Sequence, residues 1–177
     1  MSIEDLIEGC KKEDRVCQRE LYNMFAGKMM AVCIRYAKDR MEAEDILQDG
    51  FIKLFDNVSS FKNEGSFEGW IKRIFVNTAL NKIRMNKREF RDIDDVALNL
   101  PFDDQLIEKM SENDILEIIR SMPEGYKYVF NLYAIEGFSH KEIADSLGIE
   151  EASSRSQYSK AKKYLQQKII SLEKVNL

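Results

Sequence analysis

The stretch SHKEIADSLGIEEASSRSQYSKAKKYL, residues 139–165, decides the fold of the C-terminal half of this chain. Ser139 and Glu142 have the spacing of a capping box, which predicts that a helix begins here. Gly148 offers the permissive backbone that a tight turn needs, and Ala144 is small where two helices would cross closely. A short helix, a turn and a longer helix in this order predict a helix-turn-helix, a motif whose second helix enters the major groove of DNA.

The second helix of this motif is basic. From Ala152 to Lys168 the chain has five basic residues and no acidic residue. Arginine can bond guanine with two hydrogen bonds, and serine or lysine can reach bases or phosphates. The side chains expected to contact DNA are Ser153, Arg155, Ser156, Ser159 and Lys160, with Lys162 and Lys163 closer to phosphate or solvent. The alternative is an ordinary helical hairpin with a solvated basic face.

Ser154 departs from the usual pattern, because this position is often a buried aliphatic residue in a helix-turn-helix. A small polar side chain there is expected to shift the helix slightly. Ahead of the motif, the sequence predicts a helix from about Asp104 to Arg120 and a second beginning at Ser121–Glu124 with a capping box. Together with the helix at Ser139 and one over about Glu151–Ile170, the second half reads as a four-helix domain.

The N-terminal half also reads as helical. Residues 2–38 predict one or two helices, and Ser2 with Asp5 resembles a capping pair. From Met41 to Val58 apolar residues recur at helical spacing, with a polar stripe opposite them that includes Glu42 and Asp56. The turn-rich segment SSFKNEGS, residues 59–66, separates this helix from another that begins at about Phe67.

Charge is segregated along a chain whose net charge is −4. Trp70 to Arg91 has seven basic residues against one acidic residue, whereas Asp92 to Glu117 has nine acidic residues against one lysine. Helical periodicity is lost over residues 89–104, so we expect domains at 1–90 and 105–177 joined by a linker at 91–104. We hypothesise that this acidic segment folds over a basic face of the free protein.

The overall composition predicts an all-α, soluble globular protein, because 44% of the residues are hydrophobic, 33% are charged and only two are proline. The three cysteines form no Cys-x-x-Cys pair, so we expect no zinc site, no other metal and no cofactor. With no signal peptide or membrane-length apolar run, the expected location is the cytoplasm, without insertion into a membrane. The sole histidine, His140, is expected to be an exposed helix residue rather than part of an enzyme site.

Two segments resemble one known family. Residues 132–165 are similar to the −35-binding domain of extracytoplasmic-function sigma factors of bacterial RNA polymerase, and Arg35–Arg84, with its EAEDILQDGFIKLF helix, is similar to the first domain of that family. The resemblance implies that this helix docks on the clamp helices of the largest polymerase subunit. The side chains implied in that contact are Asp45, Gln48, Asp49, Ile52 and Lys53.

The same resemblance implies DNA contacts in both domains. The loop would capture a flipped base of the −10 element through Phe61, Asn63, Glu64 and Ser66, although Phe61 could equally be a core residue that anchors the loop. The following helix would contact −10 DNA through Arg73, Asn77, Arg84 and Arg88. Trp70 is expected in the core, and the basic helix named above would read the −35 element. A separate anti-sigma factor is the implied regulator.

Two other functions remain as alternatives. A stand-alone helix-turn-helix regulator would explain residues 139–165 but leaves the pattern over residues 41–88 unused. An enzyme is disfavoured, because no phosphate-binding glycine loop or nucleophile motif accompanies His140.

Overall fold

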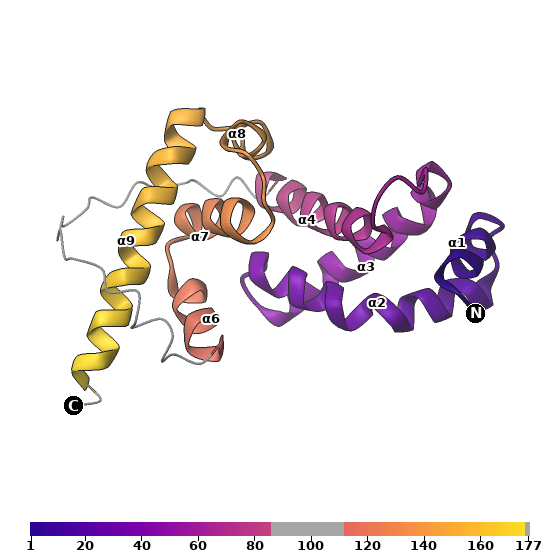
Figure 1. Cartoon of the computed structure of the whole chain (residues 1–177), viewed down its shortest axis with the longest axis horizontal. Helices are drawn as coiled ribbons and strands as arrows, with labels where there is room; N and C mark the ends of the chain where they lie inside the picture. The colour runs from indigo at the N-terminus through magenta and orange to yellow at the C-terminus, as the bar shows by residue number, and fades with distance from the viewer. Residues whose placement is uncertain (86–111, 176–177) are drawn as a thin grey trace. The chain divides into compact units, whose positions relative to one another are not determined.

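The computed structural model describes residues 1–85 and 112–175, and these residues form helices joined by short turns and loops, with no strand among them (Figure 1). The predicted all-α class is therefore confirmed. The chain divides into two compact units, Met1–Arg88 and Glu89–Leu177. The predicted linker at 91–104, the acidic segment's hypothesised fold, Arg88, and the helix start expected at Asp104 all lie outside the described residues. Within the described part, no helix is long and apolar enough to cross a membrane.

The first unit begins with two helices, α1 (Ile3–Lys11) and α2 (Arg15–Tyr36). Ser2 and Asp5 form the predicted capping box, with the backbone N–H of each donating to the side chain of the other at 2.9 and 3.2 Å. The turn between the helices contains Glu13 at φ 59°, and Asp14 then caps α2. A residue in this left-handed conformation cannot continue a helix, which is why residues 2–38 form two helices.

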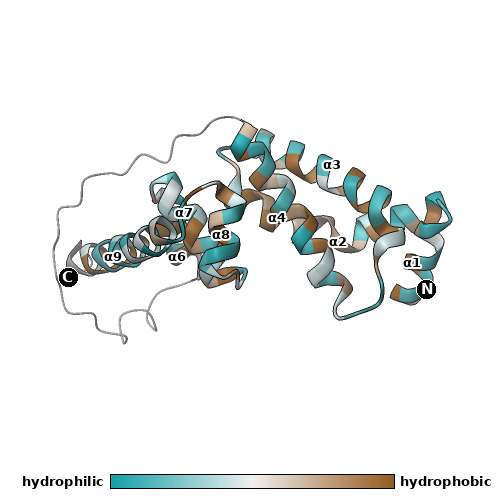
Figure 2. Cartoon of the chain, turned by 90° about the horizontal axis from the view of Figure 1, so that it is seen from above, coloured by the Kyte–Doolittle hydropathy of each residue, from teal (hydrophilic) through white to brown (hydrophobic). Residues whose placement is uncertain are grey.

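Helices α2, α3 (Arg40–Asn57) and α4 (Phe67–Met85) pack against one another, and α1 packs on α2 and on the 3-10 turn η1, Val58–Ser60 (Figure 1). Each helix buries one apolar stripe, and the alternation of brown and teal along α3 in Figure 2 shows this pattern. Gly50 brings α3 close to α4, because a Cβ placed there would lie 2.4 Å from the ring of Phe75.

Two residues of the first unit depart from the sequence patterns. Glu42 is 6% exposed and is not a solvated charge of the polar stripe: its carboxylate accepts a hydrogen bond from the Lys38 N–H at 2.7 Å. Asp39 accepts one in turn from the Glu42 N–H at 2.8 Å, so Glu42 belongs to the cap of α3. Met24, which has the spacing of the apolar stripe of α2, is exposed.

The second unit contains α6 (Glu112–Ser121), α7 (Glu124–Phe130), α8 (His140–Leu147) and α9 (Glu151–Val175). A π-helical turn, η2 (Asn131–Ile135), continues α7. Helices α6, α7 and α8 all contact α9, which confirms the expected four-helix domain with its helix-turn-helix. One part of the core is formed by Ile119, Met122, Tyr126 and Ala161.

The capping box predicted at Ser121–Glu124 is wrong. Ser121 is the last residue of α6, and its hydroxyl donates to the Ile118 carbonyl at 2.8 Å. Pro123 occupies the cap position of α7, with no side-chain hydrogen bond, rather than the first turn. The Ser121 hydroxyl bonds a carbonyl at the end of α6 rather than an N–H at the start of α7. Spacing in the sequence alone does not distinguish these two hydrogen bonds.

Candidate nucleic-acid and partner interfaces

One face of α3 in the first unit is exposed and mixes charge with apolar surface. The five residues predicted to bind a partner are all exposed on this helix, namely Asp45, Gln48, Asp49, Ile52 and Lys53. Ile52 is 60% exposed, whereas the neighbouring Phe51 is buried against Phe75, so Ile52 supplies the apolar atoms of this face. Asp45 accepts a hydrogen bond from Lys82 of α4 at 3.2 Å, which ties one acid of the face to the next helix.

The loop between η1 and α4 contains one buried aromatic residue and several exposed polar residues. Phe61 is 6% exposed and packs on the rings of Phe67 and Trp70, with centroids 4.9 and 5.3 Å apart. Its ring therefore holds the loop to α4. This agrees with the alternative in which Phe61 is a core residue that anchors the loop. Trp70 is half-buried and stacks on Phe67, in keeping with its expected place in the core.

The other loop candidates, Asn63, Glu64 and Ser66, are exposed. Asn63 at φ 58° and Gly65 at φ 86° are both left-handed, so the backbone turns sharply between the anchor and α4. The hydroxyl of Ser66 accepts a hydrogen bond from the Gly69 N–H at 3.3 Å and so lies over the first turn of α4. The loop thus presents polar side chains between the buried Phe61 and the first turn of α4.

Helix α4 presents three of its four predicted DNA-contacting residues on its surface. Arg73, Asn77 and Arg84 are exposed, at intervals of four and seven residues that place them on one side of the helix. Arg88, the fourth, lies outside the described residues. The opposite side of α4 carries Ile71, Phe75 and Ile83, which are buried in the core of the first unit.

The turn between α8 and α9 has the geometry that the sequence predicted. The Ser139 hydroxyl accepts from the Glu142 N–H at 3.2 Å, and the Glu142 carboxylate accepts from the Ser139 N–H at 2.8 Å, which completes the capping box. Gly148 ends α8 at φ 69°, and its N–H donates to the Ala144 carbonyl. Ile143, Ala144 and Leu147 are buried, so α8 packs this side against the rest of the unit.

The start of α9 presents polar side chains to solvent. Arg155, Ser156 and Ser159 are exposed, and Ser153, Lys160 and Lys163 are half-buried. Arg155 forms an ion pair with Glu151 one turn earlier, and Lys160 lies 6.0 Å from the centre of the Tyr126 ring. Exposed pairs of this kind contribute only about 0–1 kcal/mol, so Arg155 can exchange Glu151 for another partner at little cost.

His140 and Ser154 form a contact that the sequence patterns did not reveal. Ser154 is fully buried, and its Oγ lies 3.0 Å from Nδ1 of His140. His140 is half-buried rather than exposed, and its ring stacks on Tyr133 with centroids 4.3 Å apart. The two residues are separated by 14 positions, and only their places at the starts of α8 and α9 could have indicated the pair.

Burial lowers the pKa of His140 below its ordinary value of 6.5, and the positive charge of Arg155 lowers it further. The negative charge of Glu151 opposes this shift in part. The lowered pKa favours the neutral imidazole, in which one ring nitrogen donates and the other accepts, depending on the tautomer.

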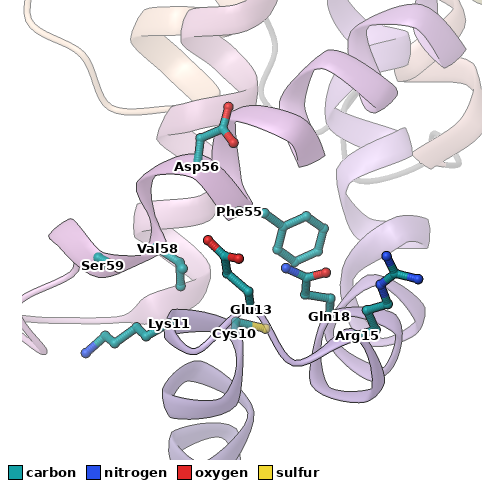
Figure 3. A pocket seen from close by; sticks show the side chains of 9 residues that line it. All are labelled: Cys10, Lys11, Glu13, Arg15, Gln18, Phe55, Asp56, Val58 and Ser59. Carbon is teal, nitrogen blue, oxygen red and sulfur yellow. The ribbon is translucent and has the colours of Figure 1, made fainter.

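Hollows in the described parts of the chain adjoin some of these residues. One of about 590 Å³ in the second unit is lined by Tyr133, Gly137, Phe138, Ser139, His140, Glu142 and Arg155, so it adjoins the exposed start of α9. The other, of about 410 Å³, is lined by residues of α1, α2, α3 and η1 (Figure 3). It mixes the cations Lys11 and Arg15 with the acids Glu13 and Asp56.

The hollow in the first unit has a thiol in its wall. Burial raises the pKa of the Cys10 thiol in its wall to about 11, so this thiol stays protonated at neutral pH and is a weak nucleophile. Among the residues that the structure describes, no group of three or more histidine, cysteine, aspartate or glutamate side chains could hold a metal ion.

Comparison with known proteins places both units in one family. The family profile described as Sigma-70 region 2 matches residues 21–89, and the profile described as Sigma-70, region 4 matches residues 112–165. The chain is 27% identical over 177 residues to the ECF RNA polymerase sigma-E factor of Haemophilus influenzae, which covers 93% of each chain. It is 28% identical over 163 residues to the ECF RNA polymerase sigma factor SigW of Bacillus subtilis, covering 84% of this chain and 87% of the relative.

Solved structures show the same fold. The sigma factor RpoE in complex with the anti-sigma factor NepR from Bartonella quintana has a TM-score of 0.52 at 20% identity, covering 85% of this chain and 95% of the other. The structure of CnrH in complex with the cytosolic domain of CnrY has a TM-score of 0.51 at 17% identity, covering 94% of this chain and 96% of that one.

Proposed function

Because this chain belongs to the sigma-70 family, as an extracytoplasmic-function sigma factor, we propose a division of roles between its two units. As a sigma factor it binds core RNA polymerase and promoter DNA and directs transcription initiation. In the proposal, a first domain at 1–90 binds the polymerase and the −10 element. A second domain at 105–177 binds the −35 element, and residues 91–104 link them.

The exposed face of α3 is the proposed polymerase-binding surface. Asp45, Asp49 and Lys53 offer charges and Ile52 offers an apolar centre, a combination that suits the charged, amphipathic clamp helices of the largest polymerase subunit. Gln48 adds a hydrogen-bonding amide to the same face. In support, the core-facing residues of α3 are buried, so this face is the part of the helix left for a partner.

The loop and α4 are the proposed −10 site. Asn63, Glu64 and Ser66 would hydrogen-bond a flipped base, while Phe61 fixes the loop that carries them. Arg73, Arg84 and Arg88 would bind the DNA backbone, and Asn77 would read a base edge. The exposure of Arg73, Asn77 and Arg84 on one side of α4 supports this role.

The start of α9 is the proposed −35 site. The exposure of its polar side chains is the observation that best supports the proposal. Arg155, Ser156 and Ser159 are exposed on a helix that a capped α8 and a glycine turn hold in place. In a helix-turn-helix these N-terminal positions reach base edges in the major groove. Ser153 and Lys160 flank them, and Lys163 lies farther along for phosphate contact.

Three further parts of the proposal concern the setting of the protein. We propose that it acts in the cytoplasm, since its partners are the polymerase and DNA. It has no catalytic activity of its own, because the polymerase carries the chemistry. A separate anti-sigma factor, of the kind that the solved relatives bind, would control it and could hold it at a membrane.

A binding assay discriminates this proposal from a stand-alone regulator. Labelled protein is titrated with core RNA polymerase and, separately, with promoter-length duplex DNA in the absence of polymerase. Tight binding to the polymerase and weak binding to free duplex supports the proposed function. Tight, sequence-selective duplex binding without any affinity for the polymerase would establish the stand-alone regulator instead.

A further inference from the structure

A hydrogen bond with one buried partner joins the two helices of the helix-turn-helix where the DNA-reading helix begins. Nδ1 of His140, the first residue of α8, lies 3.0 Å from Oγ of Ser154, the fourth residue of α9. Ser154 has no exposed surface, so water cannot replace this partner. A buried polar group that loses its partner destabilises the folded protein, and this cost restrains α9 against movement away from α8.

The imidazole ring is held from two other directions. Tyr133 of η2 stacks on it nearly in parallel, with an interplanar angle of 14°. Tyr158, one turn beyond Ser154 on α9, lies with its ring centre 5.9 Å away and also contacts Tyr133 at 4.5 Å. These contacts hold His140 between η2 and α9, so its hydrogen bond to Ser154 holds the start of α9 in one place relative to α8.

The residues beside Ser154 in sequence are those that face outward. Arg155 and Ser156 are exposed while Ser154 is buried, so any rotation of α9 about its axis moves these side chains across the surface. Hydrogen bonds to base edges tolerate little displacement, because they require donor–acceptor distances close to 3 Å and near-linear angles. The orientation of α9 thus decides which bases Arg155 and Ser156 can reach.

We propose that His140 and Ser154 are positioning residues whose hydrogen bond sets the rotation of α9 on α8 and thereby the −35 sequence that the protein selects. This inference rests on the proposed role of α9 at the −35 element. It also gives a function to the small polar residue at a position that is often aliphatic. The serine would not disturb the recognition helix but fix it through a partner on the preceding helix.

Three substitutions separate hydrogen bonding from packing. Ser154→Ala removes Oγ and little volume. His140→Phe keeps an aromatic ring against Tyr133 but lacks Nδ1, whereas His140→Asn keeps a polar atom near that position but lacks the ring. Lys141→Ala, at the next and exposed position of α8, is the matched control.

The experiment is transcription by holoenzyme from a promoter pool with a fixed −10 element and a randomised −35 element, followed by sequencing of the transcripts. We expect Ser154→Ala and His140→Phe to change the ratio between preferred −35 sequences by about two- to tenfold, the range that one hydrogen bond corresponds to. The double variant should show no further change, and His140→Asn and Lys141→Ala should keep the wild-type order. A uniform loss on every −35 sequence, or an unchanged order, would overturn the proposal.

Two controls keep the outcome interpretable. If Ser154→Ala unfolds the second unit, the two His140 variants decide the question, because His140→Asn keeps a hydrogen-bonding group near the Ser154 hydroxyl and His140→Phe does not. Equal behaviour of His140→Phe and His140→Asn would then count against the hydrogen bond. If the wild-type protein itself shows no −35 preference, the proposed −35 role of α9 fails, which is a different result from unchanged preference in the variants.

Discussion

Among single residues, Arg155 is one of the exposed side chains of α9 that we propose to contact the −35 element. Arg155→Ala should weaken transcription from the cognate promoter by about 1–3 kcal/mol, or roughly five- to 150-fold, because a bidentate contact to guanine is lost. Preference at one −35 position should relax. Lys162→Ala, on the exposed side of α9, should lower activity evenly across sequences. Both effects can be read from transcription with the randomised −35 pool, and unchanged preference in Arg155→Ala would show that another residue reads the base.

His140 gives a second prediction at this scale, concerning pH. Burial and Arg155 lower its pKa in the folded protein, so the unfolded chain binds a proton more readily. The neutral histidine contributes stability above pH 6.5, its ordinary pKa, and this contribution is lost as the pH falls through the lower folded value. Protonation would not remove the bond to Ser154, since Nδ1 can then donate; the cost arises from burial of charge and repulsion by Arg155.

The measurement is an NMR titration of His140, which is simple because it is the sole histidine of the chain. Urea unfolding of the second unit between pH 5 and 7.5 supplies the linked stability, with His140→Phe as the control that removes this titration and leaves the carboxylates unchanged. A folded-state pKa at or above the value in urea would contradict the prediction.

At the element scale, the two glycines of α2 and α3 behave oppositely despite their similar sequence setting. A Cβ at Gly50 would meet the buried Phe75 ring at 2.4 Å, whereas one at Gly27 would meet nothing within 4 Å. Gly50→Ala should therefore destabilise the first unit by about 1–3 kcal/mol through overpacking. Gly27→Ala should stabilise it by about 0.5–1 kcal/mol through helix propensity.

Trp70 is the only tryptophan, and it lies in the first unit, so its fluorescence in urea reports both substitutions. A stable Gly50→Ala variant would mean that α3 and α4 do not approach as closely as the structure has them. Loss of stability in Gly27→Ala would instead place a neighbour over the exposed face of α2.

The elements also show how far the sequence could predict the structure. The helix-turn-helix was predictable because its signals are local: the Ser139–Glu142 box, the turn at Gly148 and the apolar Ile143 and Leu147 all lie within one short segment. Ser121 has the same local spacing and yet ends α6, since a serine can bond a carbonyl behind it as well as an N–H ahead. Helix polarity at such a junction depends on tertiary packing.

Non-local contacts were the part that the sequence could not provide. Glu42 has the period of a polar stripe, but the bend at Lys38 turns the backbone towards its carboxylate. His140 and Ser154 meet only because the turn at Gly148 folds α9 onto α8. Phe61 shows the reverse case, in which a loop residue proves to be part of the core. The roles of the candidate site residues in binding remain predictions.

As a whole molecule, a sigma factor with these roles needs separate surfaces for polymerase and DNA. Asp49→Ala should lower affinity for core RNA polymerase by about 1–2 kcal/mol, or roughly five- to thirtyfold, the cost of truncating a well-contacted interface residue. The −35 and −10 preferences of the remaining transcripts should not change. Glu44→Ala is the control, because Glu44 is an exposed acid on the same helix whose charge is paired with Arg40. Altered DNA preference with intact polymerase affinity would overturn the role of Asp49.

We propose that this chain directs polymerase to promoters through a −10 site in its first unit and a −35 site in its second. Run-off transcription tests it most directly: purified protein, bacterial core RNA polymerase and a pool of randomised promoter-length DNA are combined, and the transcripts are sequenced. We expect enrichment of one −35 and one −10 element at a fixed spacing. An absence of transcripts, together with tight duplex binding by the protein alone, would contradict it.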